Sequence, residues 1–291
     1  MSDPRPTSPE ASFIDLDHVA IAAERQSDVW PRYIGELGAT WLAGGQSFGF
    51  APAQVRFVGG MRLEVLEPHA VEHNDFLRRF LDRNGPGPHH LTFKLPDLGA
   101  AIEDARSIGI EPVGIDRTDP GWQEAFLHPK QSFGIVVQLA QADHSWQSPP
   151  PSELPVAHAG PPATLTHVTH LVADLMPAIE LFGGLLAGQP TEPLAPSFAV
   201  PAGVVADLAW PGPGRLRLLQ PDPGTAESAW LGHRSGRLHH LALTVPDPAV
   251  VGGAIPMADG RLEVPPDRNH GVRLILTPGT GAASRTVGPG R

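Results

Sequence analysis

The strongest constraint on the fold is an internal repeat, because the same order of short motifs occurs twice along the 291 residues. The spacing is kept: His18 and His167 lie 149 residues apart, and His90 and His240 lie 150 apart. Self-similarity at a fixed period indicates a duplicated structural unit, so the sequence predicts two tandem copies of one domain. The matching motifs are LDHVAIA and LTHVTHL, MRLEVLEP and GRLRLLQP, GPGPHHLTFKLPDL and SGRLHHLALTVPDP, and FGIVVQL and HGVRLIL.

Composition narrows the class of protein. A net charge of −10 and a pI near 5.7, with no cluster of Lys or Arg, argue against nucleic acid and anionic membranes as main partners, so we expect a small-molecule ligand. The absence of cysteine excludes disulfides and thiolate metal sites. No run of 18 apolar residues exists and the N-terminus lacks the apolar core of a signal peptide, so we expect a cytoplasmic protein.

The predicted domain boundaries follow the repeat and a Pro-rich stretch. Six prolines in residues 142–163 indicate a stiff, partly extended linker. It separates a first domain, 13–141, from a second domain, 164–278. We expect a disordered tip at 1–12 and a flexible tail at 279–291.

The first domain shows the order β-α-β-β-β twice, which predicts an α+β fold whose sheets curl around a shared cleft. A Gly59-Gly60 pair between two alternating runs indicates a hairpin. The predicted elements are strand 13–22, helix 27–37, strands 54–58 and 61–66, helix 73–83, strand 89–95, helix 98–108, and strands 111–114, 122–127 and 134–140.

Two strands that should be apolar each carry one polar residue, Glu64 and Gln138. Burying such a group without a partner costs several kcal/mol, roughly 2–7 for an amide, so something inside the fold should bind it. Two histidines in matching strand contexts, His18 and His90, complete a plausible divalent-metal site. Successive strand residues point to opposite faces, so we expect only one of His89 and His90 to face the cleft.

These motifs resemble the vicinal oxygen chelate superfamily, which includes glyoxalase I, methylmalonyl-CoA epimerase, extradiol dioxygenases and bleomycin-resistance proteins. The first domain looks most like the epimerase and glyoxalase branch, through GPGPHHLTFKLPDL, FLHPK and the GIVVQL strand. The resemblance implies tandem domains, each of two β-α-β-β-β modules. Each module gives one metal ligand from its first strand and one from its last.

Carried over position by position, the resemblance implies that His18, Glu64, His90 and Gln138 bind one divalent metal ion. It also selects His90 over its neighbour. Two imidazoles, a carboxylate and an amide suit Zn, Ni, Co, Mn or Fe(II) without choosing among them. The implied activity is that of a lyase or isomerase, which forms a metal-stabilised enediolate from a small carbonyl or thioester substrate.

The catalytic base is not settled by the sequence. Family members commonly have Glu where this chain has Gln138, and an amide cannot accept the proton. Residues 41–61 contain no Asp, Glu or His. The candidates are Glu64 released from the metal, metal-bound hydroxide, and His128, whose alternative role is that of a strand-end residue before a proline turn. Gln138 has an alternative too, as an amide hydrogen-bonded to backbone.

The second domain lacks the complete ligand set. Arg217 stands in place of Glu64 and Ile275 in place of Gln138, and arginine cannot ligate a metal. The interval from His240 to Ile275 is 35 residues, against 48 from His90 to Gln138, so we expect a missing strand or loop and an opened cleft. This domain is interpreted as structural, interfacial or a degenerate binding site.

Two other functions stay open. One is a metal-free protein that binds or sequesters a small molecule in the cleft, as resistance proteins of the superfamily do. The other is an Fe(II) extradiol-type dioxygenase, which the chain length and the tandem domains suggest, although those enzymes normally place their ligands in the second domain. Domains of this superfamily pair within a chain or between chains, so a homodimer is also open.

Overall fold

The computed structural model describes residues 13–142, 147–194 and 202–279. The predicted disordered tip, 1–12, and all but Gly279 of the predicted tail lie outside the described residues. Among the helices that are described, none has the length and apolar character that a membrane span requires.

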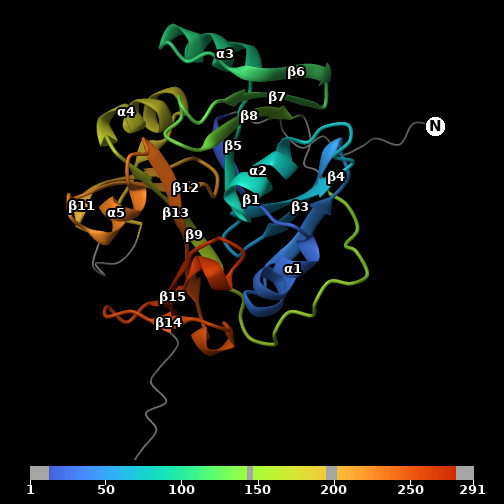
Figure 1. Cartoon of the computed structure of the whole chain (residues 1–291), viewed down its shortest axis with the longest axis vertical. Coiled ribbons are helices and arrows are strands. Elements are labelled where there is room, and N and C mark those ends of the chain that lie inside the picture. Colours follow the sequence, from blue (N-terminus) through green and yellow to red (C-terminus); the bar gives the residue numbers. More distant parts are fainter. Residues whose placement is uncertain (1–12, 143–146, 195–201, 280–291) are drawn as a thin grey trace, which may run out of the picture.

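The first domain is built on one eight-stranded sheet. Its strands are β1 (Asp15–Ala22), β2 (Thr40–Gly44), β3 (Gly49–Arg56), β4 (Arg62–His69), β5 (Gly87–Lys94), β6 (Val113–Asp119), β7 (Trp122–Leu127) and β8 (Val136–Ala142). The order across the sheet is β2-β3-β4-β1-β5-β8-β7-β6. Figure 1 shows β6, β7 and β8 next to one another at the top of the view. Strand β1 runs parallel to β4 and antiparallel to β5, and β5 runs parallel to β8. The two predicted modules therefore join through β1 and β5.

The helices of this domain fall close to their predicted positions. They are α1 (Gln26–Trp30), which continues as the π-helical segment η1 (Pro31–Glu36), then α2 (Phe76–Asn84) and α3 (Leu98–Ser107). Helix α3 begins where Asp97 caps it, since the Asp97 side chain accepts a hydrogen bond of 2.9 Å from the backbone N–H of Ala100. Helix α2 begins three residues later than predicted.

The first module contains a strand that the sequence analysis missed. Strand β2 lies at the edge of the sheet, where it pairs only with β3. Its short TWLAG segment has no clear alternation of apolar and polar residues, so periodicity does not reveal it. The predicted hairpin is confirmed, because Gly59 and Gly60 lie in the turn between β3 and β4 with φ of 88° and 98°.

The second domain repeats this architecture. Its strands are β9 (Thr164–Val172), β10 (Gln189–Pro190), β11 (Gly203–Ala209), β12 (Arg215–Pro221), β13 (Gly236–Val245), β14 (Ile255–Pro256), β15 (Leu262–Val264) and β16 (Leu274–Pro278). The sheet order is β10-β11-β12-β9-β13-β16-β15-β14, the same as in the first domain. Its helices are α4 (Leu175–Ile179), η2 (Glu180–Leu185) and α5 (Ala226–Leu231), with single turns η3 (Pro248–Val250) and η4 (Pro266–Arg268).

The shorter last module of the second domain has lost a helix, not a strand. The prediction of a missing strand is wrong, since β14, β15 and β16 are all present. The ten-residue helix α3 has only the three-residue turn η3 as its counterpart, and β14 and β15 are two and three residues long. The four ligand-equivalent positions are all retained within the sheet.

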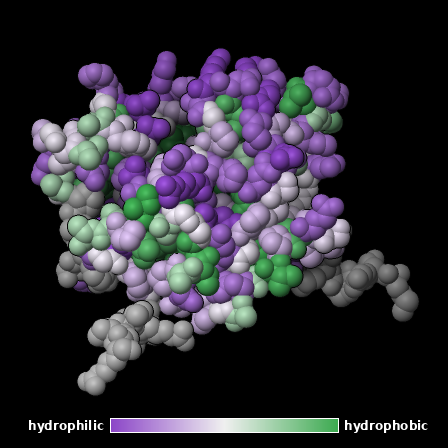
Figure 2. Space-filling view, turned by 60° about the horizontal axis from the view of Figure 1, so that its bottom comes forward, coloured by the Kyte–Doolittle hydropathy of each residue, from purple (hydrophilic) through white to green (hydrophobic). Residues whose placement is uncertain are grey.

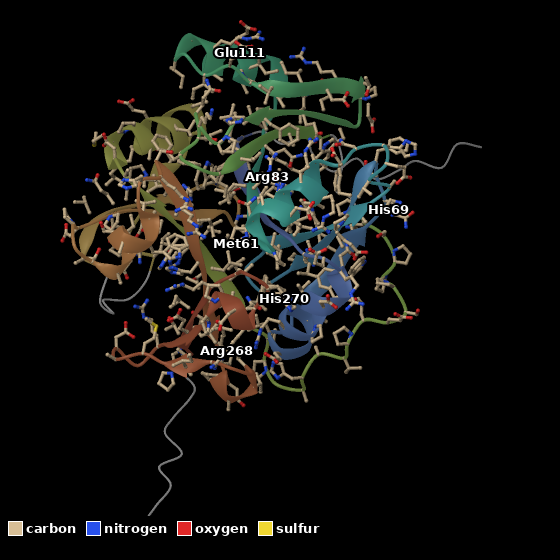
Figure 3. All side chains as sticks on the ribbon, in the orientation of Figure 1. Met61, His69, Arg83, Glu111, Arg268 and His270 are labelled. Carbon is tan, nitrogen blue, oxygen red and sulfur yellow. The ribbon has the colours of Figure 1, made fainter. Side chains whose placement is uncertain are left out.

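The two domains pack against each other over a continuous apolar core. Phe93 of β5 contacts Phe182 of η2 and Trp210, with ring centroids 6.3 and 5.3 Å apart. Tyr33 of η1 accepts a hydrogen bond of 3.2 Å from the Asn269 amide, deep inside the protein. Figure 3 shows side chains throughout the region between the domains, with the buried Met61 near its centre. The contacts tie the halves into one body.

The Pro-rich segment lies along the first domain. In residues 147–163 it forms no helix or strand. The backbone N–H of His158 donates to the carbonyl of Gly35 and that of Ala163 donates to the carbonyl of Leu37, each at 2.9 Å.

On the face of the molecule seen in Figure 2, hydrophilic side chains predominate and hydrophobic ones gather in small groups.

Candidate metal centre

The first sheet brings three of the four predicted ligands into direct proximity. Strand β1 places His18, β4 places Glu64 and β5 places His90, and these three strands are neighbours in the sheet. The Nε2 atoms of His18 and His90 lie 3.5 and 3.6 Å from Oε2 of Glu64. One potential ligand atom from each residue lies within 4.8 Å of the other two, so the set could hold a metal ion. Within the described ranges no second cluster of His, Asp or Glu meets this criterion.

In both histidines the Nε2 atom, which is the potential metal ligand, is buried and lacks a hydrogen-bond partner among the described residues. His18 is 1% exposed and His90 5%. A buried polar atom without a partner costs about 1–3 kcal/mol, so native proteins rarely keep two such atoms side by side. Both face one carboxylate oxygen, which is the arrangement that a shared cation would satisfy. The residues present therefore fit a divalent metal ion.

A second carboxylate orients His18. Asp17 Oδ2 lies 2.8 Å from His18 Nδ1, and Asp17 also bonds to Arg62 at 3.0 Å. Although burial would raise the pKa of Asp17, the hydrogen bond from His18 and the charges of Lys94 and Arg62 hold it well below its usual range. A carboxylate on the far nitrogen of a histidine fixes its tautomer and directs Nε2 at the metal.

The two site histidines differ in charge. Burial lowers the pKa of His18, but the Glu64 carboxylate and the hydrogen bond to Asp17 outweigh it and raise that pKa to about 9. Burial, together with the charges of His89 and His18, lowers the pKa of His90 far below its ordinary value. Before metal binding, His18 is thus the charged partner of Glu64, and His90 is neutral with a free lone pair.

Gln138 lies beside this group but is hydrogen-bonded elsewhere. Its carbonyl accepts a 2.6 Å hydrogen bond from the Thr92 hydroxyl, and its amide donates to Glu124 Oε2 at 2.7 Å. The partners are side chains, so the alternative of an amide bonded to backbone is wrong. The carbonyl oxygen keeps a second lone pair, and ligation by Gln138 stays a prediction.

A cavity of about 820 Å³ opens over the cluster. Strands β3, β4, β5, β7 and β8 all contribute to its wall, which shows that the sheet curls into a half-barrel. Glu64, His90, Gln138 and His128 line it, whereas His18 lies behind it. This size is typical of small-molecule sites.

The expectation that only one histidine of the pair faces the cleft is wrong. His89 lines the cavity as well, and its Nδ1 lies 2.8 Å from Nδ1 of His90. The pairing of β1 with β5 jumps from Ala20–His90 to Ile21–Pro88, so His89 is the extra residue of a β-bulge. A bulge breaks the alternation of faces on which the prediction relied.

Glu124 is a cavity residue that the sequence analysis did not single out. It lies on β7, lines the cavity, and accepts hydrogen bonds from Gln138 and from the Trp122 indole, the latter at 2.8 Å. The alternation of Trp122, Glu124 and Phe126 in GWQEAFL places all three on one strand face. That alternation was a usable signal, because β7 was predicted with the right boundaries.

His128 lies at the exposed rim. Its Nδ1 accepts a 3.1 Å hydrogen bond from the backbone N–H of Lys130. The Nδ1 atom is therefore already engaged by the backbone, and catalysis by His128 stays a prediction.

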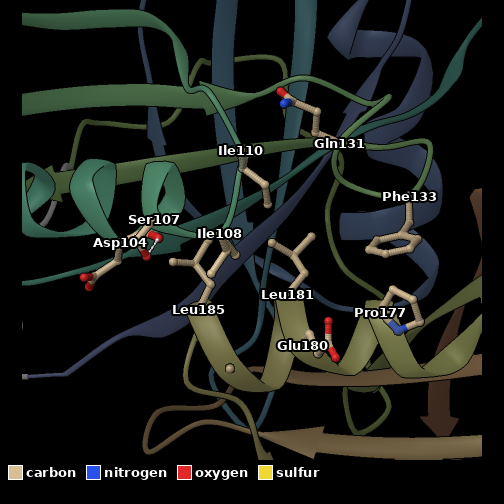
Figure 4. A pocket seen from close by; sticks show the side chains of 11 residues that line it. Asp104, Ser107, Ile108, Ile110, Gln131, Phe133, Pro177, Glu180, Leu181 and Leu185 are labelled. Carbon is tan, nitrogen blue, oxygen red and sulfur yellow. Dashed lines mark hydrogen bonds between the residues drawn. The ribbon is translucent and has the colours of Figure 1, made fainter.

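A second cavity, of about 580 Å³, lies between the domains (Figure 4). Residues of α3 and of the α4–η2 segment line it, among them Ile108, Leu181 and Leu185. Its ionisable groups are Asp104 and Glu180, and it contains none of the predicted ligands.

Comparisons with known proteins agree with this architecture. A structure of 4-hydroxymandelate synthase from Streptomyces coelicolor aligns over 93% of this chain and 94% of its own, with 16% identity and a TM-score of 0.62, which shows a shared fold. Methylmalonyl-CoA epimerase from Mycobacterium tuberculosis aligns over 46% of this chain and 93% of its own, with 25% identity and a TM-score of 0.41. A hypothetical protein from Bacillus halodurans gives 25% identity over 46% of this chain and 99% of its own, with a TM-score of 0.41.

The search of curated proteins gave no match. The family model described as "Glyoxalase-like domain" matches residues 16–186, more than half of the chain. The chain therefore belongs to the glyoxalase-like domain family, within the vicinal oxygen chelate superfamily.

Proposed function

We propose that this protein is a metal-dependent lyase or isomerase that removes a proton next to a carbonyl group of a small molecule. The observation that carries the proposal is the pair of buried, unpartnered Nε2 atoms of His18 and His90 facing Glu64 beneath a cavity. A divalent ion held by these residues would act as a Lewis acid, stabilising the negative charge that develops on the carbonyl oxygen when the proton leaves.

Glu124 is the proposed base. Its carboxylate faces the cavity beside Gln138, and a general base must lie within about 3 Å of the proton that it takes. Hydrogen bonds from Trp122 and Gln138 hold one of its oxygens, which orients the other. Glu64 is committed to the histidines and to the Gln54 amide at 3.1 Å, which makes it a poorer base.

The first test is metal content with matched variants. We expect purified protein to hold about one divalent ion per chain by plasma mass spectrometry, and His18→Ala to remove it. His167→Ala, the equivalent change in the second domain, should leave the metal in place. If the wild type binds neither zinc nor cobalt in titration calorimetry, the proposal fails and metal-free small-molecule binding becomes the better explanation.

The base is tested separately. Exchange of the substrate α-proton in deuterated water should slow by a factor of about 10² or more in Glu124→Gln, because general base catalysis is typically worth 10²–10⁴. The variant should keep its metal. Unchanged exchange would exclude Glu124 as the base.

One further observation favours a second candidate. Two histidines and one carboxylate are also the ligand set of non-haem Fe(II) oxygenases. Oxygen consumption by the Fe(II)-loaded protein in the presence of a catechol, absent with zinc, would select this activity over the isomerase.

A further inference from the structure

Four large aromatic side chains line the first-domain cavity. Phe50 of β3, Phe76 of α2, and Trp122 and Phe126 of β7 line it, with Leu66 among the apolar residues between them. Phe50 and Phe76 pack edge to face, with ring centroids 5.6 Å apart. Aromatic side chains favour flat, apolar partners through buried area and through offset or edge-to-face contacts.

Among the residues that the structure describes, no Lys or Arg lines this cavity, whereas the acidic residues Glu64, Asp119 and Glu124 do. The His18 ring lies behind the wall, between Asp17 and Glu64.

This lining disfavours substrates that are attached to an anionic carrier, such as coenzyme A or glutathione. The phosphates of coenzyme A and the carboxylates of glutathione are normally bound by Arg, Lys or helix N-termini. A cavity of about 820 Å³ with carboxylates in its wall would repel these groups and leave them unpaired. An uncharged ligand avoids this cost.

We propose that the substrate is an uncharged aryl ketone that is not attached to an anionic carrier. Its ring would lie among Phe50, Phe76, Trp122 and Phe126, with its carbonyl group toward the cluster of His18, Glu64 and His90. This inference rests on the proposed function, because the cluster must hold a metal ion for the carbonyl oxygen to be ligated.

The test is titration calorimetry of the zinc-loaded protein with three probes. They are 2-hydroxyacetophenone, hydroxyacetone, which has the same oxygens without the ring, and a lactoyl thioester of glutathione. We expect the aryl ketone to bind at least about tenfold more tightly than hydroxyacetone, since burying a ring contributes more than 1.4 kcal/mol. The glutathione thioester should bind more weakly than the aryl ketone.

Single substitutions measure separately how the aromatic wall and the charge of the wall contribute to binding. Phe50→Ala should lower affinity for the aryl ketone about tenfold and leave hydroxyacetone unchanged. Trp230→Ala, an aromatic truncation in the second domain, should change neither. Val113→Lys places a cation at a half-exposed position of the wall and should improve binding of the glutathione thioester.

The outcomes distinguish the two proposals. If zinc binds but the glutathione thioester binds more tightly than the aryl ketone, the substrate inference is wrong while the metal-dependent function stands. If zinc does not bind, the proposed function fails, and the ring preference is then measured on the metal-free protein with the same probes. Equal affinities for the aryl ketone and hydroxyacetone would also overturn the inference.

Discussion

The two domains have the same strand register, but at one equivalent position the first carries an acidic side chain, Glu64, and the second a basic one, Arg217. In the first sheet, Ala20 is paired with both Glu64 and His90; in the second, its equivalent Thr169 is paired with both Arg217 and His240. The β-bulge at the histidine pair recurs too, since His239 is the unpaired residue there. Both copies thus share the backbone geometry of the candidate metal site, and they differ there in the side chains that it presents.

Where the first domain has the candidate metal centre, the second domain has an ion pair. Arg217 donates two hydrogen bonds of 2.7 Å to the carboxylate of Asp207, which stands where the first domain has Gln54. Burial and the charge of Arg217 lower the pKa of His167 to about 3, so its ring is neutral. A buried guanidinium in the place of a carboxylate ligand would repel a cation.

The largest expected effect comes from breaking that ion pair. Arg217→Leu removes the partner of a nearly buried carboxylate, and breaking a buried pair from one side typically costs about 3–5 kcal/mol. We expect a loss at the low end of this range in urea denaturation at pH 7. Metal binding in the first domain should not change.

The control for this prediction is the double variant Arg217→Leu/Asp207→Asn. The neutral amide needs no counter-charge and can still accept from the backbone N–H of Leu194. Most of the lost stability should return. A single variant as stable as the wild type would show that the ion pair does not hold the second domain together.

Much of this comparison was predictable from the sequence, because it depends on the identity of residues in recognisable strands. The motif repeat gave the tandem domains, and the placement of Glu64 and Arg217 at equivalent positions is confirmed by the strand register. Burial of polar residues in apolar strands was also a reliable signal.

The features that could not be predicted are those in which the backbone departs from regular periodicity. Because of the bulge at His89, successive residues there do not alternate between the two faces of the sheet. Edge strand β2 lacks the alternation of apolar and polar residues by which a strand is recognised. The partnership of Gln138 with Thr92 and Glu124 depends on side-chain directions across three strands, which no single segment encodes.

The second-largest expected effect concerns the residue that precedes the β1 histidine. This residue is Asp17 in the first domain and Thr166 in the second. Asp17 bonds to His18, whereas its equivalent Thr166 offers His167 only a hydroxyl, at 3.2 Å. Asp17→Thr copies the second domain into the first and should weaken cobalt binding about 10–100-fold, the usual cost of losing such an orienting partner. Titration followed by the cobalt absorption bands measures this. Thr166→Val should have no effect, and unchanged affinity in Asp17→Thr would show that Asp17 does not orient the ligand.

The smallest effect concerns Asp15, two residues earlier, whose equivalent in the second domain is the uncharged Thr164. Asp15 packs against Gly212 and Gly214 at the domain interface, and its burial and the charge of Asp17 raise its pKa from 3.8 to about 6. Because the folded pKa exceeds the unfolded value, ionised Asp15 destabilises the protein above about pH 6, and protonation relieves this cost as the pH falls from about 6 to about 4. Asp15→Asn should therefore raise the free energy of unfolding at pH 8 by on the order of 1 kcal/mol, after discounting for partial exposure. The gain should shrink through this pH window in parallel urea titrations of variant and wild type, whereas a gain that persists undiminished at pH 4 would mean that packing, not charge, is responsible.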